Sequence, residues 1–285
     1  MIEIQTFGVI GAGQMGGGIA QVAAASGLHV ILNDMNLEIA GKGKQLIADN
    51  LQRLVTKDKL TADEKTLILA RITASGHLED MAAADFVVEA ASENEQIKFK
   101  LFETLDQVCE DHVILASNTS SIPIGRIASR TKRPKQVIGM HFMNPVPVMQ
   151  LVEIIQGLAT SDETYEATRK LTEQLGKTPV PANDFPGFIA NRILLPMINE
   201  AIFCLYQGVG DCESIDTVMK LGMNHPMGPL ALADLIGLDT CLAIMNTLQQ
   251  GLGDPKYRPC PLLRQYVEAG WLGRKTGRGF YNYNK

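Results

Sequence analysis

The chain has 285 residues, of which 46% are hydrophobic, and its formal net charge is −5 at pH 7. This length exceeds one usual core and favours two domains, while the acidic balance argues against a nucleic-acid partner, whose phosphates require a basic surface. The 5 cysteines include no C-x-x-C pair, so the sequence favours neither a disulfide framework nor a zinc site, and no metal is expected.

The start of the chain gives no sign of a secretory signal. A strand pattern begins by Ile4 without a charged region and an apolar stretch before it, and no apolar run approaches the length of a membrane span. Together with the cysteine usage, these features predict a cytoplasmic protein that does not associate with membranes.

The first predicted strand, residues 7–10, leads directly into a glycine-rich turn. Gly11 permits the tight turn, Gly13 lets backbone N–H groups approach a pyrophosphate, and Gly16 lets the following helix pack closely. The helix then begins with its positive dipole end toward the phosphates. The turn therefore predicts a dinucleotide site made by Gly11, Ala12, Gly13, Gln14, Met15 and Gly16.

Asp34 follows the second predicted strand and bears on the choice of cofactor. A carboxylate at this point accepts hydrogen bonds from both ribose hydroxyls and repels a 2′-phosphate. No arginine lies between Asp34 and Gly41, which favours NAD over NADP, although Lys42 and Lys44 are near enough in the sequence to weaken the exclusion. The alternative is that Asp34 only caps the helix that begins near Asn36.

Strand-like and helix-like patterns alternate over the first two thirds of the chain. The strand-like runs are residues 7–10, 29–32, 86–88, 113–115, 137–140, 151–155 and 178–181, and the helical patterns include residues 14–26, 37–55, 95–109 and 162–175. This alternation predicts an α/β fold with a parallel, doubly wound sheet of the Rossmann type. The helix-like stretches 37–55 and 62–71 exceed one plain crossover and indicate an appendage.

The composition changes near residues 183–187, where a Pro-Gly turn leads into a long apolar helix pattern over residues 188–206. Later patterns are helical as well, so we expect a nucleotide-binding domain over residues 1–183 and an all-α domain over residues 184–285. The helix 188–206 is apolar on more than one side. A domain of this size would expose part of that surface, which predicts a two-fold homodimer through it.

Polar residues follow two of the predicted strands, at the sheet edge where open α/β folds bind ligands. Ser120 comes after the strand 113–115, and His141 ends the run 137–140. His exchanges protons near neutral pH, and Glu153 on the next strand could hold its imidazole in one tautomer and stabilise the charged form. His141 and Glu153 are therefore a candidate proton-transfer pair.

Six ordered motifs across the chain carry a family resemblance: GAGQMGGGIA, ASNTSSI, GMHFMNPVPVMQLVEI, DFPGFIANRILLP, LGMNHPMGPLALAD and GRKTGRGFYNY. With these motifs the sequence resembles the 3-hydroxyacyl-CoA dehydrogenases of the short-chain, 3-hydroxybutyryl-CoA type. The resemblance implies oxidation of the C3 hydroxyl of an acyl-CoA thioester by NAD, with His141 and Glu153 as the acid–base pair.

The resemblance also implies roles for further residues. Ser120 and Asn191 would contact the substrate, with the reaction between the two domains, and the NAD contacts would come from Asp34, Glu93, Lys98, Ser120, Asn144 and Lys275. The contact of Lys275 implies that the C-terminal tail folds back toward the first domain. On the appended helices, Lys57 matches a phosphate-binding lysine of the CoA site, and Asn50 stands where relatives have serine.

Two other functions remain open from the sequence. Dehydrogenases of free 3-hydroxy acids share a glycine loop and a helical second domain, but they usually use a lysine for proton transfer and would leave the appended helices without a CoA. A non-catalytic NAD-binding relative is the second alternative, and the joint presence of Ser120, His141, Glu153 and Asn191 argues against it.

Overall fold

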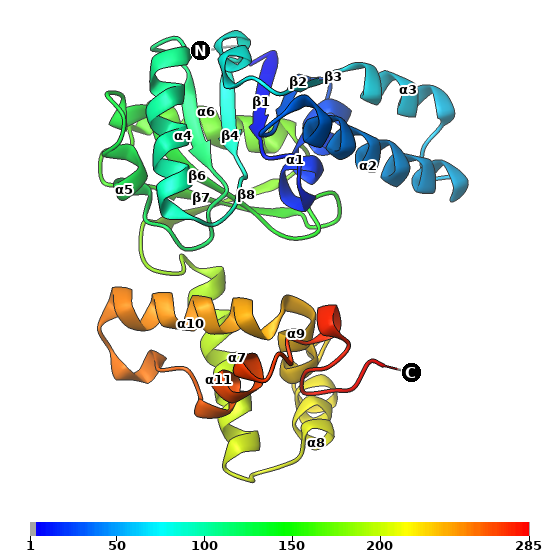
Figure 1. Cartoon of the computed structure of the whole chain (residues 1–285), viewed down its shortest axis with the longest axis vertical. Coiled ribbons are helices and arrows are strands. Elements are labelled where there is room, and N and C mark those ends of the chain that lie inside the picture. The colour runs from blue at the N-terminus through cyan, green and yellow to red at the C-terminus, as the bar shows by residue number, and fades with distance from the viewer. Residues whose placement is uncertain (1–3, 285) are drawn as a thin grey trace. The chain divides into compact units, whose positions relative to one another are not determined.

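An eight-stranded sheet with the order β3-β2-β1-β4-β5-β6-β7-β8 organises the first part of the chain (Figure 1). The computed structural model describes residues 4–284, and the chain divides into two compact units between Phe185 and Pro186. The strands are β1 (Thr6–Ile10), β2 (His29–Asn33), β3 (Ile72–Ser75), β4 (Phe86–Glu89), β5 (Ile114–Ser117), β6 (Val137–Phe142), β7 (Leu151–Gln156) and β8 (Thr178–Asn183).

Neighbouring strands are parallel throughout this sheet except for the antiparallel pair β6–β7. The helices that connect them are α1 (Gln14–Ala25), α2 (Leu37–Thr56), α3 (Ala62–Ala70), α4 (Glu95–Val108), α5 (Ile124–Ala128) and α6 (Asp162–Gln174). Every residue of β4 and β5 is buried, as strands covered on both faces require. The predicted α/β fold with a Rossmann-type sheet is confirmed.

Strand β3 is absent from the strands that the sequence predicts, and it changes the interpretation of the helices before it. Its sequence, ITAS, contains a single large apolar residue, Ile72, which gives almost no periodic signal. Because β3 pairs with β2, α2 and α3 form the crossover between these strands. This crossover contains two helices where a plain one has a single helix, and Figure 1 shows both extending away from the sheet. A role for them in binding CoA stays a prediction.

The first helix lies unusually close to the first strand. A Cβ atom added to Gly16 would lie 1.8 Å from the carbonyl oxygen of Gly11, and Gly11 has a φ of +96°. Both positions therefore require glycine, one for close packing and the other for its backbone conformation. This arrangement brings the first turn of α1 directly to the carboxyl end of β1.

The second unit is helical. Its helices are α7 (Ala190–Tyr206), α8 (Cys212–Thr217), α9 (Pro229–Ile236), α10 (Leu238–Leu252) and α11 (Pro261–Glu268), with a π-helical turn over Val218–Gly222. The long helix α7 begins two residues later than the pattern predicts. Gly187 and Phe188 have positive φ values of 77° and 49°, which are incompatible with a right-handed helix.

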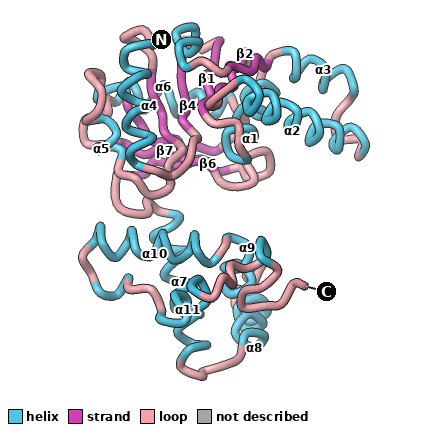
Figure 2. Tube along the Cα trace, in the orientation of Figure 1, coloured by secondary structure: helices cyan, strands magenta, loops and turns pink. Residues whose placement is uncertain are grey.

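The C-terminal tail is irregular and is held against its own unit (Figure 2). The buried carboxylate of Asp234 accepts hydrogen bonds from the backbone N–H groups of Phe280 and Tyr281, at 2.9 Å each. The hydroxyl of Tyr281 donates to Asp216 at 2.9 Å. These bonds fix the segment that follows Lys275.

Within residues 4–284, no single helix combines the length and the apolar character of a membrane span, while α9 and α10, which are bent by 98° with respect to each other, pass that test only as a pair.

Candidate functional site

The glycine loop and Asp34 form one hydrogen-bonded unit. The carboxylate of Asp34 accepts from the backbone N–H of Ala12 at 2.7 Å and from that of Met35 at 2.7 Å. Asp34 does not cap α2, because the side chain of Asn36 accepts from the N–H of Ile39 and provides that cap. The alternative role considered for Asp34 is therefore wrong, and its carboxylate lies beside the loop.

This loop fits the NAD molecule that the sequence predicts. Gly13 is the N-cap of α1 and provides no side-chain cap, so the N–H groups of the first turn are not covered by a side-chain acceptor from that position. A Cβ atom added to Gly13 would meet nothing within 4 Å, which shows open space in front of the loop. Space, helix-terminal donors and a nearby carboxylate are the features that a dinucleotide requires.

The two lysines that could have favoured a 2′-phosphate have protein partners. The ammonium of Lys42 pairs with Glu38 at 2.6 Å, and that of Lys44 donates to the carbonyl of Ile72 in β3. The structure thus directs Lys44 toward the sheet. Their proximity in the sequence is not evidence against NAD.

His141 and Glu153 face each other across the antiparallel pair β6–β7, in direct register. The Nδ1 atom of His141 lies 2.8 Å from Oε2 of Glu153, and the two residues are only 8% and 1% exposed. Because the carboxylate accepts, Nδ1 carries the proton, and Nε2 is the basic nitrogen of the neutral ring. The structure brings the two predicted residues into contact, and their role in proton transfer stays a prediction.

The segment that carries Ser120 is organised by Glu93. One carboxylate oxygen of Glu93 accepts from the Thr119 hydroxyl at 2.6 Å, from the Ser120 N–H at 2.9 Å and from the Ser121 N–H at 3.1 Å. Burial raises the pKa of Glu93, but the charge of Lys98 and these hydrogen bonds outweigh it, so the net pKa is below the usual value. Glu93 is therefore held as an anion next to Ser120.

Lys98 is more deeply buried than a cofactor contact alone would require. It is 1% exposed, and its ammonium lies 2.7 and 2.8 Å from the two carboxylate oxygens of Glu89 and 3.3 Å from Glu93. Sequence reasoning missed Glu89. The sequence indicates Glu89 only as an acidic residue at the end of the otherwise apolar strand FVVE. A charge at such a position requires a partner.

The loop between β6 and β7 follows the strand that carries His141 and contacts the start of α1. The side-chain amide of Gln14 donates to Oδ1 of Asn144 at 3.0 Å, and a Cβ atom on Gly18 would lie 2.9 Å from Val146. The buried ammonium of Lys177 donates to the carbonyls of Val146 and Met149 at 2.7 and 2.8 Å. The predicted cofactor residue Asn144 is thus held against the start of α1.

Other predicted residues lie apart from this cluster along the chain. Asn50 and Lys57 are exposed on α2 and at its C-cap. Asn191 lies in the first turn of α7, in the helical unit. Lys275, also in that unit, pairs with Asp239 at 2.6 and 2.7 Å. Their contacts with cofactor or substrate stay predictions.

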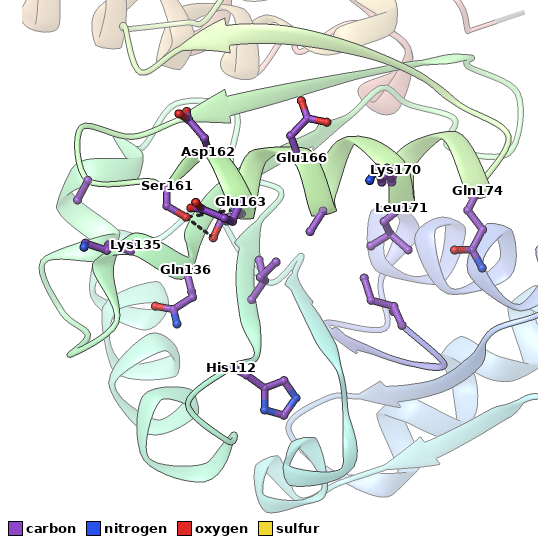
Figure 3. Close-up of a pocket in the computed structure, with 15 residues that line it drawn as sticks. His112, Lys135, Gln136, Ser161, Asp162, Glu163, Glu166, Lys170, Leu171 and Gln174 are labelled. Atoms are coloured by element: carbon purple, nitrogen blue, oxygen red, sulfur yellow. Dashed lines mark hydrogen bonds between the residues drawn. The ribbon is translucent and has the colours of Figure 1, made fainter. Parts of the chain in front are cut away.

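A separate cavity of about 1310 Å³ lies at the amino-terminal ends of the strands (Figure 3). Its walls include Ile114 at the start of β5, Gln136 before β6 and the first turns of α6. Figure 3 shows that His112 lies well apart from the acidic residues of α6. None of the predicted site residues, all of which the structure describes, lines this cavity, and within residues 4–284 no cluster of side chains is arranged for a metal ion.

Comparisons with known proteins agree with this arrangement. A family model described as "3-hydroxyacyl-CoA dehydrogenase, NAD binding domain" matches residues 6–185, and one described as "3-hydroxyacyl-CoA dehydrogenase, C-terminal domain" matches residues 187–283. A protein from Bacillus subtilis (strain 168), described as a probable 3-hydroxybutyryl-CoA dehydrogenase, is 60% identical over 100% of this chain and 99% of its own length.

Two further relatives are similar over their full length. The 3-hydroxybutyryl-CoA dehydrogenase of Bradyrhizobium diazoefficiens is 58% identical over 98% of this chain and 96% of its own. The crystal structure of (S)-3-hydroxybutyryl-CoA dehydrogenase from Ralstonia eutropha has a TM-score of 0.97 and 53% identity, covering 99% of this chain and 100% of that one. The chain therefore belongs to the 3-hydroxyacyl-CoA dehydrogenase family, and its first unit is the NAD-binding domain of an NAD-dependent dehydrogenase.

Proposed function

We propose that this protein interconverts (S)-3-hydroxybutyryl-CoA and acetoacetyl-CoA, and that the His141–Glu153 pair moves the proton. The observation that carries the mechanism is the buried 2.8 Å contact between the two side chains. The substrate is supported by the descriptions of full-length relatives at 58–60% identity. NAD, when bound, accepts the hydride from C3 or returns it.

The proton follows a separate path through the protein. Nε2 of His141 takes the proton of the C3 hydroxyl while the C3–H bond breaks, and Glu153 stabilises the imidazolium that results. In the reverse direction the imidazolium donates to the oxygen of the ketone. The oxidised product is the 3-ketoacyl thioester, and the proton leaves His141 to solvent before the next turnover.

Neighbouring residues bind and orient the substrate in this proposal. The Ser120 hydroxyl donates to the C3 oxygen, and the Asn191 amide, contributed by the helical unit, donates to the thioester carbonyl. Glu93, Lys98, Asn144 and Lys275 complete the NAD site around the glycine loop. The exposed Lys57 meets the anionic nucleotide end of CoA, with Asn50 beside it on α2.

We also propose that the active protein is a homodimer formed through the helical unit. Large apolar side chains remain exposed there, among them Ile193 of α7, which is 67% exposed, and Leu221, which is 81% exposed. A second copy of the same surface would cover them.

One assay separates the candidate functions. The purified protein is mixed with NADH and acetoacetyl-CoA, or with NADH and free acetoacetate, and the absorbance of the reduced nicotinamide is followed. Oxidation with the thioester and not with the free acid is expected. Oxidation with acetoacetate alone would indicate a free-acid dehydrogenase, and no oxidation with either would leave a non-catalytic NAD-binding protein.

A further inference from the structure

We propose that Glu89 is a positioning residue that holds the 117–121 segment, and with it the Ser120 hydroxyl, in the arrangement that binds substrate. The proposal rests on the role of Ser120 given above. Glu89 ends β4 and is 0% exposed, so it acts from behind the site and touches neither substrate nor cofactor.

Glu89 is a carboxylate surrounded by donors. Both of its oxygens accept from the Lys98 ammonium, and the carboxylate also accepts from the Ser117 hydroxyl at 2.7 Å and from the Ala91 N–H at 2.7 Å. A buried carboxylate is tolerated only when its charge is paired and its lone pairs are used. Here four hydrogen bonds and one ion pair meet that condition, so the position of Glu89 is tightly determined.

These contacts close a ring behind Ser120. From Glu89 the ring runs through Lys98 to Glu93 at 3.3 Å, and from Glu93 to the Thr119 hydroxyl at 2.6 Å. The backbone N–H of Thr119 donates to the Ser117 hydroxyl at 3.2 Å, and that hydroxyl donates back to Glu89. Glu89 therefore supports the segment by two routes, one through a charge and one through a hydroxyl.

One member of this ring, Glu93, also holds Ser120. Glu93, held by Lys98, accepts from the Ser120 N–H at 2.9 Å and lies 3.3 Å from the Ser120 hydroxyl. If Lys98 loses Glu89, its nearest remaining carboxylate is Glu93. The ammonium then pairs more closely with Glu93, whose Oε2 it already contacts. This shifts the carboxylate whose Oε1 holds the Ser120 segment, and the hydroxyl loses its fixed orientation.

The replacement Glu89→Gln tests this with little change in shape. The amide keeps one acceptor oxygen but places an NH₂ donor against the Lys98 ammonium or the Ala91 N–H. We expect kcat/KM for acetoacetyl-CoA to fall by about 10- to 100-fold, which is the effect of displacing a positioning group by about 1 Å. The matched control is Glu103→Gln on the exposed face of α4, which should leave kcat/KM unchanged.

A double-mutant cycle with Ser120→Ala distinguishes positioning from general destabilisation. In the Ser120→Ala background, Glu89→Gln should reduce kcat/KM by less than about threefold, because the group that it positions is gone. An equal reduction in both backgrounds would overturn the proposal. Ser117→Ala, which removes only the hydroxyl route, should show the same coupling with a smaller loss if Glu89→Gln folds poorly.

Amide hydrogen exchange provides a measurement that does not depend on turnover. In Glu89→Gln the N–H groups of Ser120 and Ser121 should exchange at least about tenfold faster, while the strands of the sheet keep their protection. Unchanged exchange, or equal acceleration everywhere, would refute the proposal even if acetoacetyl-CoA proved not to be the substrate. Absence of wild-type turnover would instead count against the proposed function.

Discussion

In the proposed mechanism a single imidazole, that of His141, transfers the proton with the support of its buried contact to Glu153. In His141→Gln the neutral amide has no basic nitrogen, so turnover of acetoacetyl-CoA should fall by about 10²- to 10⁴-fold, the usual contribution of an acid–base group. The dissociation constant for NADH, measured by fluorescence titration, should stay within about threefold because His141 is not among the residues proposed to bind NAD. Unchanged turnover would remove His141 from the mechanism.

Glu93 links stability to pH in a defined direction. Its pKa in the folded protein lies below its usual value because of Lys98 and the hydrogen bonds of the 119–121 segment. Its contribution to stability is therefore present above the usual pKa and is lost as the pH falls through the folded pKa. Glu93→Gln should therefore lower the Tm at neutral pH. The difference from wild type should shrink as the pH falls through the lowered pKa of Glu93, because the wild-type carboxyl then becomes protonated too. A difference in Tm that is independent of pH would contradict this role.

Individual residues differ in how far the sequence predicts them. His141 and Glu153 could be paired in advance because each stands on a clear strand pattern and a single loop joins the two strands. Glu89 could not, since its partners Lys98 and Ser117 are 9 and 28 residues away. The fold brings these two donors to Glu89, and neither helical nor strand periodicity in the sequence predicts such contacts.

Among the secondary-structure elements, a substitution at the start of α1 distinguishes an effect on cofactor binding from an effect on stability. Gly13→Ala should leave the Tm nearly unchanged, because the added Cβ meets nothing within 4 Å. The same methyl group would occupy the space in front of the loop, and the affinity for NADH should fall by at least about tenfold.

Gly41→Ala in α2 is the matched control for that substitution. Its added Cβ also meets nothing within 4 Å, and Ala should stabilise the helix by about 0.5–1 kcal/mol without affecting NADH. Equal NADH affinity in both variants would mean that the phosphates do not approach Gly13.

The helix pair α2–α3 carries the proposed contact with CoA. Lys57→Ala should raise the KM for acetoacetyl-CoA by about two- to fivefold with little effect on kcat, as expected for one exposed charge pair that is present in both ground and transition states. The effect should decrease at high salt. Lys65→Ala on α3, whose ammonium donates to Gln52 at 2.7 Å, is the control, and an equal rise in both variants would argue against a specific phosphate contact.

The same region shows which elements a sequence can predict. Helices α2 and α3 were predictable to within a residue or so because they have helical periodicity and clear starts, such as the Thr61–Glu64 capping box of α3. Strand β3 has four residues and one large side chain. Its position in the sheet is set by its pairing with β2. That pairing joins residues far apart in the chain, so no local sequence pattern predicts it.

For the assembled protein, the proposed dimer gives a prediction about association. Ile193→Asp places a charge on an exposed apolar position of α7 and should shift the protein toward monomer in sedimentation velocity at micromolar concentration. Leu158→Asp in the first unit, at a fully exposed position, should leave the association state unchanged. A wild-type protein that is monomeric at all concentrations would contradict the proposal.

The antiparallel pairing of β6 with β7 has one more consequence. Facing residues on paired strands keep their Cβ atoms about 4.5–5.5 Å apart, so the geometry of the proton relay is set inside a single sheet. The separation of His141 from Glu153 therefore depends on the pairing of two strands within the first unit.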